Sequence, residues 1–216
     1  MHIPIKMLKT LRYLYNDLTL NITTQEENVR TLFVGDVHGC SAELNILLEQ
    51  TKPTRVILLG DIFTKGPDPL GVWDLIEKNT MEAVLGNHDQ RLLTSKQRKI
   101  SDEVYTWLSH LPLFIRGPSW IAVHGGINPN GPTLMDEAVY MRRWPMESRK
   151  AEFWWKQYRG SHLVLYGHDA KRQLQDHRPF SLGLDTGCVY GYSLTGYLLE
   201  EDRLYSVPAL QPYCPV

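Results

Sequence analysis

The stretch Thr31-Leu-Phe-Val-Gly-Asp-Val-His-Gly39 decides the fold, because it joins a short apolar run to a glycine and two polar side chains. An apolar run this short, closed by glycine, is typical of a buried strand. Asp36 and His38 would then lie just beyond the carboxyl end of that strand. In α/β folds ligands bind at this edge, and glycine allows the backbone to turn sharply and approach closely there.

The same arrangement recurs four more times along the chain. The further junctions are Gly60-Asp61 after residues 55–59, Gly86-Asn87-His88-Asp89 after 83–85, His124-Gly125-Gly126 after 120–123 and Gly167-His168-Asp169 after 162–166. One glycine and one aspartate at a strand end usually form only a turn. Five ordered junctions can instead converge on one point and present carboxylates, imidazoles and a carboxamide together.

This donor set predicts a metal site. Mixed oxygen and nitrogen ligands favour Mn, Fe, Zn, Co or Ni over Ca or Mg, and the junctions hold no thiolate pair of the kind that binds structural zinc. More ligands are present than one ion needs, so two ions that share a carboxylate fit better. Two-metal sites serve phosphate-ester hydrolysis.

Helix signals alternate with the strands in the first half, and strands dominate the second. We expect Ser41 to cap one helix, Asp68 with Pro69 to begin another, and Ser101 to begin a third. The inward positions are predicted to be Leu44, Leu47 and Leu48 in the first helix, Leu70, Trp73 and Ile76 in the second, and Val104, Tyr105 and Leu108 in the third. A fourth helix is expected over 152–158, a hairpin over 113–123, strands over 180–184, 192–199 and 203–207, and a long irregular region over 126–150. This order predicts an α/β fold with a sheet or β-sandwich of mixed strands flanked by helices.

Composition narrows the classes further. With 216 residues, 43% hydrophobic and 22% charged, the chain is long enough for one ordinary domain and is not disordered. The net charge of -1 argues against bulk nucleic-acid binding, and no apolar run reaches the length of a membrane span. The three cysteines form no C-x-x-C pair, which favours a reducing cytoplasm. Cys40 and Cys188, which abut the motifs, are interpreted as small buried fillers.

The first 30 residues form an N-terminal extension to the domain predicted over 31–216. Leu8, Leu11 and Leu14 have helical spacing, with Lys6 and Lys9 between them. Two interpretations stay open for this segment. It is an extra helix docked on the domain or, as the weaker alternative, an organelle-targeting helix.

The ordered motifs resemble those of the calcineurin-like metallophosphoesterases, and more narrowly the phosphoprotein-phosphatase branch. The resemblance covers residues 31–207 and rests on G-D-x-H-G, G-D, G-N-H-D, H-G-G and G-H in this order. Much of the wider superfamily has G-H-x-H in its last motif, whereas Ala170 stands here at the second histidine. The resemblance implies a metallophosphoesterase-type β-sandwich and metal-dependent hydrolysis of phosphate bonds.

The resemblance also implies a role for each motif residue. One metal ion would be held by Asp36, His38 and Asp61, and the second by Asp61, Asn87, His124 and His168. Mn²⁺ is the expected ion, with Fe, Zn, Co or Ni as alternatives. His88 would protonate the leaving oxygen as general acid, and Asp185 would orient a ligand without binding metal.

Thr64 and Lys65 distinguish this chain from the protein Ser/Thr phosphatases and indicate a smaller subgroup of the family. Protein Ser/Thr phosphatases commonly carry an aspartate, which supports the general-acid histidine, where this chain has Thr64, and an arginine where it has Lys65. The symmetric diadenosine-tetraphosphate hydrolases also lack that aspartate, carry G-N-H-D, and have a stretch similar to Leu184–Gly191. The chain is therefore most similar to that subgroup, although Tyr192 replaces its usual second glycine.

The leading functional hypothesis is hydrolysis of phosphoanhydrides such as dinucleoside polyphosphates. The residues expected to bind phosphate are Lys65, Arg142 and Arg143, and Arg91 is a weaker candidate. The partner would be a small phosphorylated substrate or a phosphoprotein, and no membrane is expected. The alternatives are a Ser/Thr phosphoprotein phosphatase, an endopolyphosphatase, an enzyme acting on capped RNA ends and a non-catalytic binding module. A nuclease is disfavoured by Ala170 and by the neutral charge.

Overall fold

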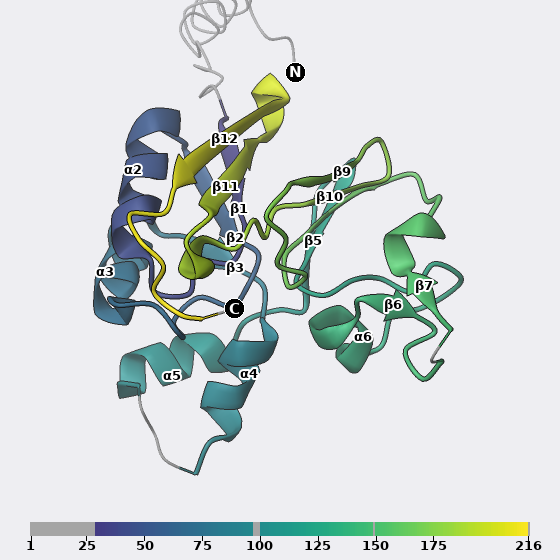
Figure 1. The fold of residues 1–216 in the computed structure, drawn as a ribbon, viewed down its shortest axis with the longest axis horizontal. Coiled ribbons are helices and arrows are strands. Elements are labelled where there is room, and N and C mark those ends of the chain that lie inside the picture. Colours follow the sequence, from purple (N-terminus) through teal and green to yellow (C-terminus); the bar gives the residue numbers. More distant parts are fainter. Residues whose placement is uncertain (1–28, 97–99, 149, 216) are drawn as a thin grey trace, which may run out of the picture.

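The structure is a computed structural model that describes residues 29–96, 100–148 and 150–215 (Figure 1). The predicted N-terminal helix lies outside the described residues. In the part of the chain that is described, no helix is long and apolar enough to cross a bilayer.

Two five-stranded mixed sheets form the centre of the molecule. The first has the order β12-β11-β1-β2-β3, formed by β12 (Arg203–Pro208), β11 (Ser193–Leu198), β1 (Thr31–Val34), β2 (Arg55–Leu58) and β3 (Glu82–Ala83). The second has the order β4-β5-β8-β10-β9, formed by β4 (Phe114–Arg116), β5 (Trp120–Val123), β8 (Leu163–Tyr166), β10 (Ser181–Gly183) and β9 (Gln175–His177). Strands β1, β2 and β3 run parallel, as do β5, β8 and β10, so their carboxyl ends gather at common edges. The predicted mixed α/β fold is confirmed.

The buried apolar residues of the described chain form three cores, and alternation along β1 places its side chains in two of them. In β1, Leu32 and Val34 pack into the helix-covered core, while Phe33 faces the second sheet. The Phe33 ring meets Trp120 edge to face, with ring centroids 4.8 Å apart. Successive side chains of a strand point to opposite faces, so a strand that is covered on both faces buries every side chain.

Helices lie around the two sheets (Figure 1). They are α2 (Ser41–Thr51), α3 (Pro69–Asn79), α4 (Asn87–Thr94), α5 (Asp102–Ser109) and α6 (Met135–Tyr140), with short 3-10 turns η1 (Trp154–Lys156), η2 (Cys188–Tyr190) and η3 (Leu199–Glu201). The predicted caps of α3 and α5 are confirmed: Asp68 accepts from the Gly71 N–H at 2.9 Å, and Ser101 accepts from the Val104 N–H at 3.3 Å.

Two predictions about the helices were wrong. Cys40, rather than Ser41, is the N-cap of α2, and the Ser41 hydroxyl instead donates to Asp68 at 2.6 Å. Leu70 is 69% exposed, because the buried stripe of α3 runs through Val72 and Ile76.

The segment expected as a helix over 152–158 begins instead as strand β7 (Glu152–Phe153) and continues as η1. Strand β7 pairs with β6 (Arg143–Trp144), and the Trp154 N–H donates to the Arg142 carbonyl. This pairing overrides local helix preference. The region 126–150 also holds helix α6, so it is less irregular than expected.

Candidate metal centre

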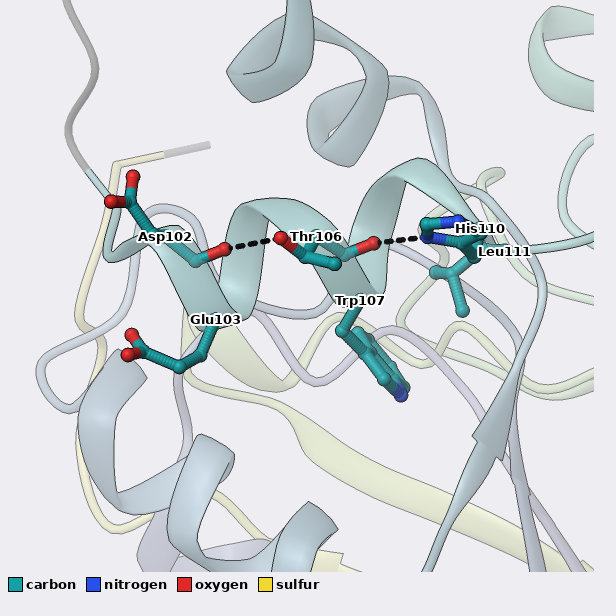
Figure 2. A pocket seen from close by; sticks show the side chains of 6 residues that line it. All are labelled: Asp102, Glu103, Thr106, Trp107, His110 and Leu111. Atoms are coloured by element: carbon teal, nitrogen blue, oxygen red, sulfur yellow. Dashed lines mark hydrogen bonds between the residues drawn. The ribbon is translucent and has the colours of Figure 1, made fainter.

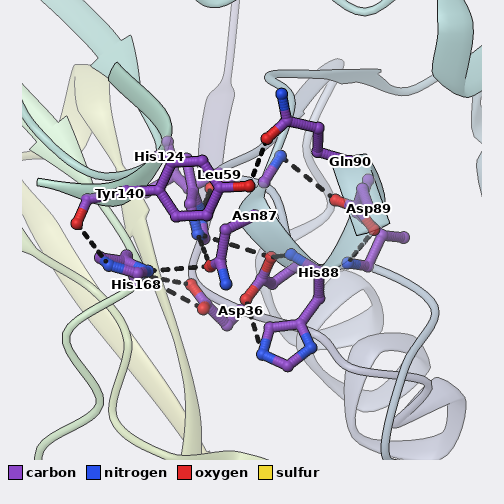
Figure 3. A network of polar contacts seen from close by, with 12 residues as sticks. Asp36, Leu59, Asn87, His88, Asp89, Gln90, His124, Tyr140 and His168 are labelled. Carbon is purple, nitrogen blue, oxygen red and sulfur yellow. Dashed lines mark hydrogen bonds and ion pairs between the residues drawn. The ribbon is translucent and has the colours of Figure 1, made fainter. Parts of the chain in front are cut away.

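The five motif junctions meet between the carboxyl ends of the two sheets, as the sequence predicts (Figure 3). They enclose a narrow hollow of about 50 Å³, room for small ions and a few waters. Its lining residues are Asp36, His38, Asp61, Lys65, Asn87, His88, Arg142, His168, Ala170, Asp185 and Tyr190. His124 is fully buried and contacts Asn87 beside it.

Three of the candidate ligands have a left-handed backbone. The φ angles are 48° at His38, 53° at Asp61 and 67° at His168. L-residues adopt this region at a cost, and such strain gathers at functional sites. Gly60, with φ 90°, has no room for a side chain, since a Cβ would lie 2.8 Å from Gly86 and from the His124 ring.

Backbone carbonyls fix the tautomers of two candidate histidines. The His124 Nδ1–H donates to the Leu59 carbonyl at 2.7 Å, and the His168 Nε2–H donates to the Tyr140 carbonyl at 3.1 Å. Burial lowers the pKa of both rings, to about 4 for His124 and about 2 for His168, so each is neutral at pH 7. The remaining nitrogen of each ring therefore carries a lone pair instead of a proton.

Those two lone pairs point at a third acceptor. The Asn87 Oδ1 lies 3.0 Å from His124 Nε2 and 2.9 Å from His168 Nδ1 (Figure 3). Three acceptors at this separation have no hydrogen to share, and a cation between them would satisfy all three. The donor chemistry thus fits a metal ion at the position that the sequence predicts.

Buried carboxylates complete the set of candidate metal ligands. The ligand atoms of Asp36, Asp61 and His124 lie within 4.8 Å of one another. Burial raises the pKa of Asp61 to about 7 and that of Asp185 to about 6, and burial with the charge of Asp185 raises the pKa of Asp36. Such a cluster of desolvated acids is stabilised by divalent cations.

Asp61 occupies the position that a shared ligand needs. Its Oδ2 lies 3.7 Å from His38 Nε2, and its Oδ1 lies 3.5 Å from His124 Nε2. One carboxylate thus reaches the histidines of both predicted ligand groups. Asp185 faces Asp36 and accepts from the Gly187 N–H at 3.1 Å, consistent with an orienting role.

The candidate acid His88 lies at the rim. Its Nε2 is 4.0 Å from Asp61 Oδ2, and its ring meets His38 edge to face at 5.2 Å. Burial, followed by the charges of Lys65 and Arg91, lowers the pKa of His88 to about 4. The ring is therefore neutral in the substrate-free protein and has one N–H to donate.

Of the predicted phosphate ligands, Lys65 and Arg142 line the hollow. The Lys65 ammonium donates to the Tyr190 hydroxyl at 2.8 Å, and the Arg142 guanidinium donates to the His168 carbonyl at 3.0 Å. Arg143 is not among the lining residues: it donates to the Ala151 carbonyl at 3.0 Å and lies 4.2 Å over the Phe153 ring. The two adjacent arginines, which the sequence does not distinguish, thus have separate surroundings.

Sequence reasoning missed two residues of this centre. Asp89, fully buried, accepts from the backbone N–H groups of Ile62 at 3.0 Å and Gly86 at 3.3 Å and so ties two ligand loops together. Its place in G-N-H-D is the signal that could have found it. Tyr190 enters the hollow from the Leu184–Gly191 stretch, a region that the sequence singles out without assigning this side chain.

A larger hollow of about 680 Å³ lies on α5, where Asp102, Glu103, Thr106 and Trp107 line it (Figure 2). None of the motif residues lines it. Its two carboxylates would repel a phosphate, so it is not a second phosphate site.

Comparison with known proteins agrees with this geometry. Residues 29–205 match the model of the calcineurin-like phosphoesterase family. The symmetrical bis(5'-nucleosyl)-tetraphosphatase of Vibrio campbellii is 27% identical, over 83% of this chain and 99% of its own length. An asymmetrical bis(5'-nucleosyl)-tetraphosphatase of Oceanobacillus iheyensis is 24% identical, over 83% of this chain and 92% of its own length.

Among solved structures, one described as "a putative diadenosine tetraphosphatase" is 33% identical, with a TM-score of 0.79, and the match covers 85% of this chain and 95% of that one. A metallophosphoesterase from Sphaerobacter thermophilus shares the fold, at 17% identity and a TM-score of 0.58.

Proposed function

The chain belongs to the calcineurin-like phosphoesterase family and is a hydrolase, and we propose that it cleaves phosphoanhydrides such as dinucleoside polyphosphates. The substrate rests on relatives named as tetraphosphatases and on the chemistry of this chain's own residues. We further propose a small phosphorylated substrate as the partner and the cytoplasm as the location.

The family implies divalent metal ions, and the acceptor cluster fits them. We propose two ions, Mn²⁺ first, with Asp36, His38 and Asp61 holding one and Asp61, Asn87, His124 and His168 the other. When bound, the ions make a water nucleophile available near neutral pH and neutralise phosphoryl charge.

The chain's own side chains bind and orient the phosphates. Lys65 and Arg142 add positive charge to the hollow, so a chain of net charge -1 can still concentrate charge where phosphate enters. The Tyr190 hydroxyl positions the Lys65 ammonium. His88 has an N–H at the rim and donates it toward the leaving oxygen.

The observation that carries the anhydride assignment is the position of Thr64. Its hydroxyl lies 3.0 Å from His38 Nδ1, so it orients a candidate metal ligand and supplies no carboxylate to His88. A phosphate leaving group is a weak base and departs with little help from an acid, whereas a serine alkoxide is a strong base that needs a well-supported acid. A histidine that Thr64 leaves without a supporting carboxylate suits the first reaction better.

A rate comparison tests this proposal. The Mn²⁺-loaded protein is given diadenosine tetraphosphate, a phosphoserine peptide and inorganic polyphosphate, and kcat/KM is measured for each. We expect the highest value on the dinucleotide, with ADP as the product if cleavage is symmetrical or ATP with AMP if it is asymmetrical. A preference for the phosphopeptide would establish the alternative, a Ser/Thr phosphatase, and a preference for polyphosphate would establish an endopolyphosphatase. The absence of any turnover would favour a binding module.

A further inference from the structure

A second group of metal-binding side chains lies outside the centre described above. It consists of Cys40, Glu43 and Cys188, and one ligand atom from each lies within 4.8 Å of the others. Cys40 and Glu43 come from the start of α2, and Cys188 begins η2. All three are buried, with exposed fractions of 0%, 0% and 1%.

The Glu43 carboxylate is only half satisfied. Its Oε1 accepts from the Leu210 N–H at 2.9 Å and from the Tyr213 hydroxyl at 2.8 Å. Its Oε2 is buried and has no hydrogen-bond partner. A buried carboxylate oxygen without a partner is costly, because it has lost water and gained nothing in exchange.

We infer that Cys40, Glu43 and Cys188 bind a thiophilic divalent cation, Zn²⁺, separate from the ions of the phosphate site. Two thiolates and a carboxylate are ligands that zinc accepts, whereas Mg²⁺ and Ca²⁺ prefer oxygen alone. On binding, the two S–H bonds break, two S–Zn bonds and one O–Zn bond form, and both protons leave to solvent. The Glu43 Oε2 gains the partner that it lacks.

The position of the group indicates a structural role. Because all three ligands are buried, a substrate could not reach an ion held there. Cys40 follows the candidate ligand His38 by two residues, and Cys188 follows Asp185 by three. An ion would therefore brace two loops of the phosphate site and, through Glu43, the C-terminal segment.

Cobalt spectroscopy tests the inference independently of hydrolysis. Co²⁺ bound by thiolate gives a sulfur-to-metal charge-transfer band in the near ultraviolet, and the predicted ligands of the phosphate site include no sulfur. Untagged, metal-stripped and fully reduced full-length chain is titrated with Co²⁺. We expect the band in the wild type and in Asp61→Asn, which disturbs only the phosphate site. Cys214→Ser is the matched control, since Cys214 lies outside the group and should leave the band unchanged.

Substitutions of the three proposed zinc ligands should remove or weaken the charge-transfer band. Cys40→Ser and Cys188→Ser should each lose most of the band, and Glu43→Gln should weaken Co²⁺ binding there about tenfold or more. No band in the reduced wild type overturns the inference without reference to any variant, and it restores the interpretation of the cysteines as buried fillers. A band that persists in Cys40→Ser also overturns it. Since the readout is spectroscopic, failure here leaves the proposed hydrolysis untouched.

Discussion

Replacement of Arg142 by alanine should impair catalysis while replacement of its neighbour Arg143 should not. The Arg142 guanidinium lines the hollow and is held by the His168 carbonyl at 3.0 Å and by the Asp169 carboxylate at 3.5 Å. Arg143 is bound to the Ala151 carbonyl and lies over Phe153, so its charge is engaged away from the hollow. The two residues are adjacent and chemically identical, which makes each the matched control for the other.

The size of the effect follows from the surroundings. A charge-assisted hydrogen bond is worth about 1.5–3 kcal/mol. Because the Arg142 side chain is 54% exposed, water weakens the interaction and the lower half of that range applies. At about 1.4 kcal/mol per factor of ten, kcat/KM should fall about 10- to 30-fold. The Asp169 carboxylate, whose side chain is only 10% exposed, keeps the Lys171 ammonium at 3.2 Å when Arg142 is removed, so the loss of fold stability should stay near about 1 kcal/mol.

The assay is kcat/KM on diadenosine tetraphosphate, with thermal unfolding measured in parallel. Arg143→Ala should stay within about twofold of the wild type in kcat/KM and lose about 1 kcal/mol of stability, since it gives up one hydrogen bond and one cation–π contact. Arg142→Lys should recover part of the activity, because it keeps the charge without the fork of donors. Equal losses in the two alanine variants, or a larger loss for Arg143→Ala, would refute this assignment of the phosphate ligand.

Three further predictions concern a helix cap, a glycine beside a candidate metal ligand, and the ionisation of Asp61. Asp68→Ala should destabilise the chain by about 1–2 kcal/mol in chemical denaturation and leave turnover unchanged, because it removes the cap of α3 and the hydrogen bond from the Ser41 hydroxyl; a lost activity would contradict this. Gly167→Ala should weaken Mn²⁺ binding measured by calorimetry, since its Cβ would lie 2.1 Å from the Asp36 Oδ1, whereas Gly131→Ala, with nothing within 4 Å, should behave as the wild type. The pKa of Asp61 is raised from 3.8 to about 7, so the metal-free fold loses stability as pH rises from about 4 to about 7, and above 7 the carboxylate is ionised and ready to bind metal. The increase in thermal midpoint on adding Mn²⁺ should therefore grow between about pH 5 and pH 7 and level off above it, and an increase that shrinks between pH 5 and pH 7 would show that another group controls binding.

The sequence predicts the strand junctions well, because each one couples a short apolar run to glycine and a polar residue. The burial of Leu32, Phe33 and Val34 on both faces of β1 follows directly from that pattern. The failures are elements set by distant contacts. Residues 152–158 have helical spacing, yet backbone pairing with Arg143–Trp144 holds the start of this segment as a strand.

The same distinction holds within the site. The predicted metal ligands could be identified because their motifs keep a fixed order along the chain. The different surroundings of Arg142 and Arg143 could not, since they depend on the contacts of β6 with β7 and on the Asp169 carboxylate. The contact between Thr64 and His38 could not be predicted either, because it joins two separate loops.

The most direct test of the account is a Mn²⁺ titration of chelator-stripped protein, in which the hydrolysis of diadenosine tetraphosphate is followed as ions are added. We predict no turnover without metal, a rise that saturates when both ions of the phosphate site are filled, and no turnover at any concentration in folded Asp61→Asn. Full activity in the stripped protein, or wild-type turnover in Asp61→Asn, would contradict the proposal that Asp61 joins two ions in a phosphoanhydride hydrolase.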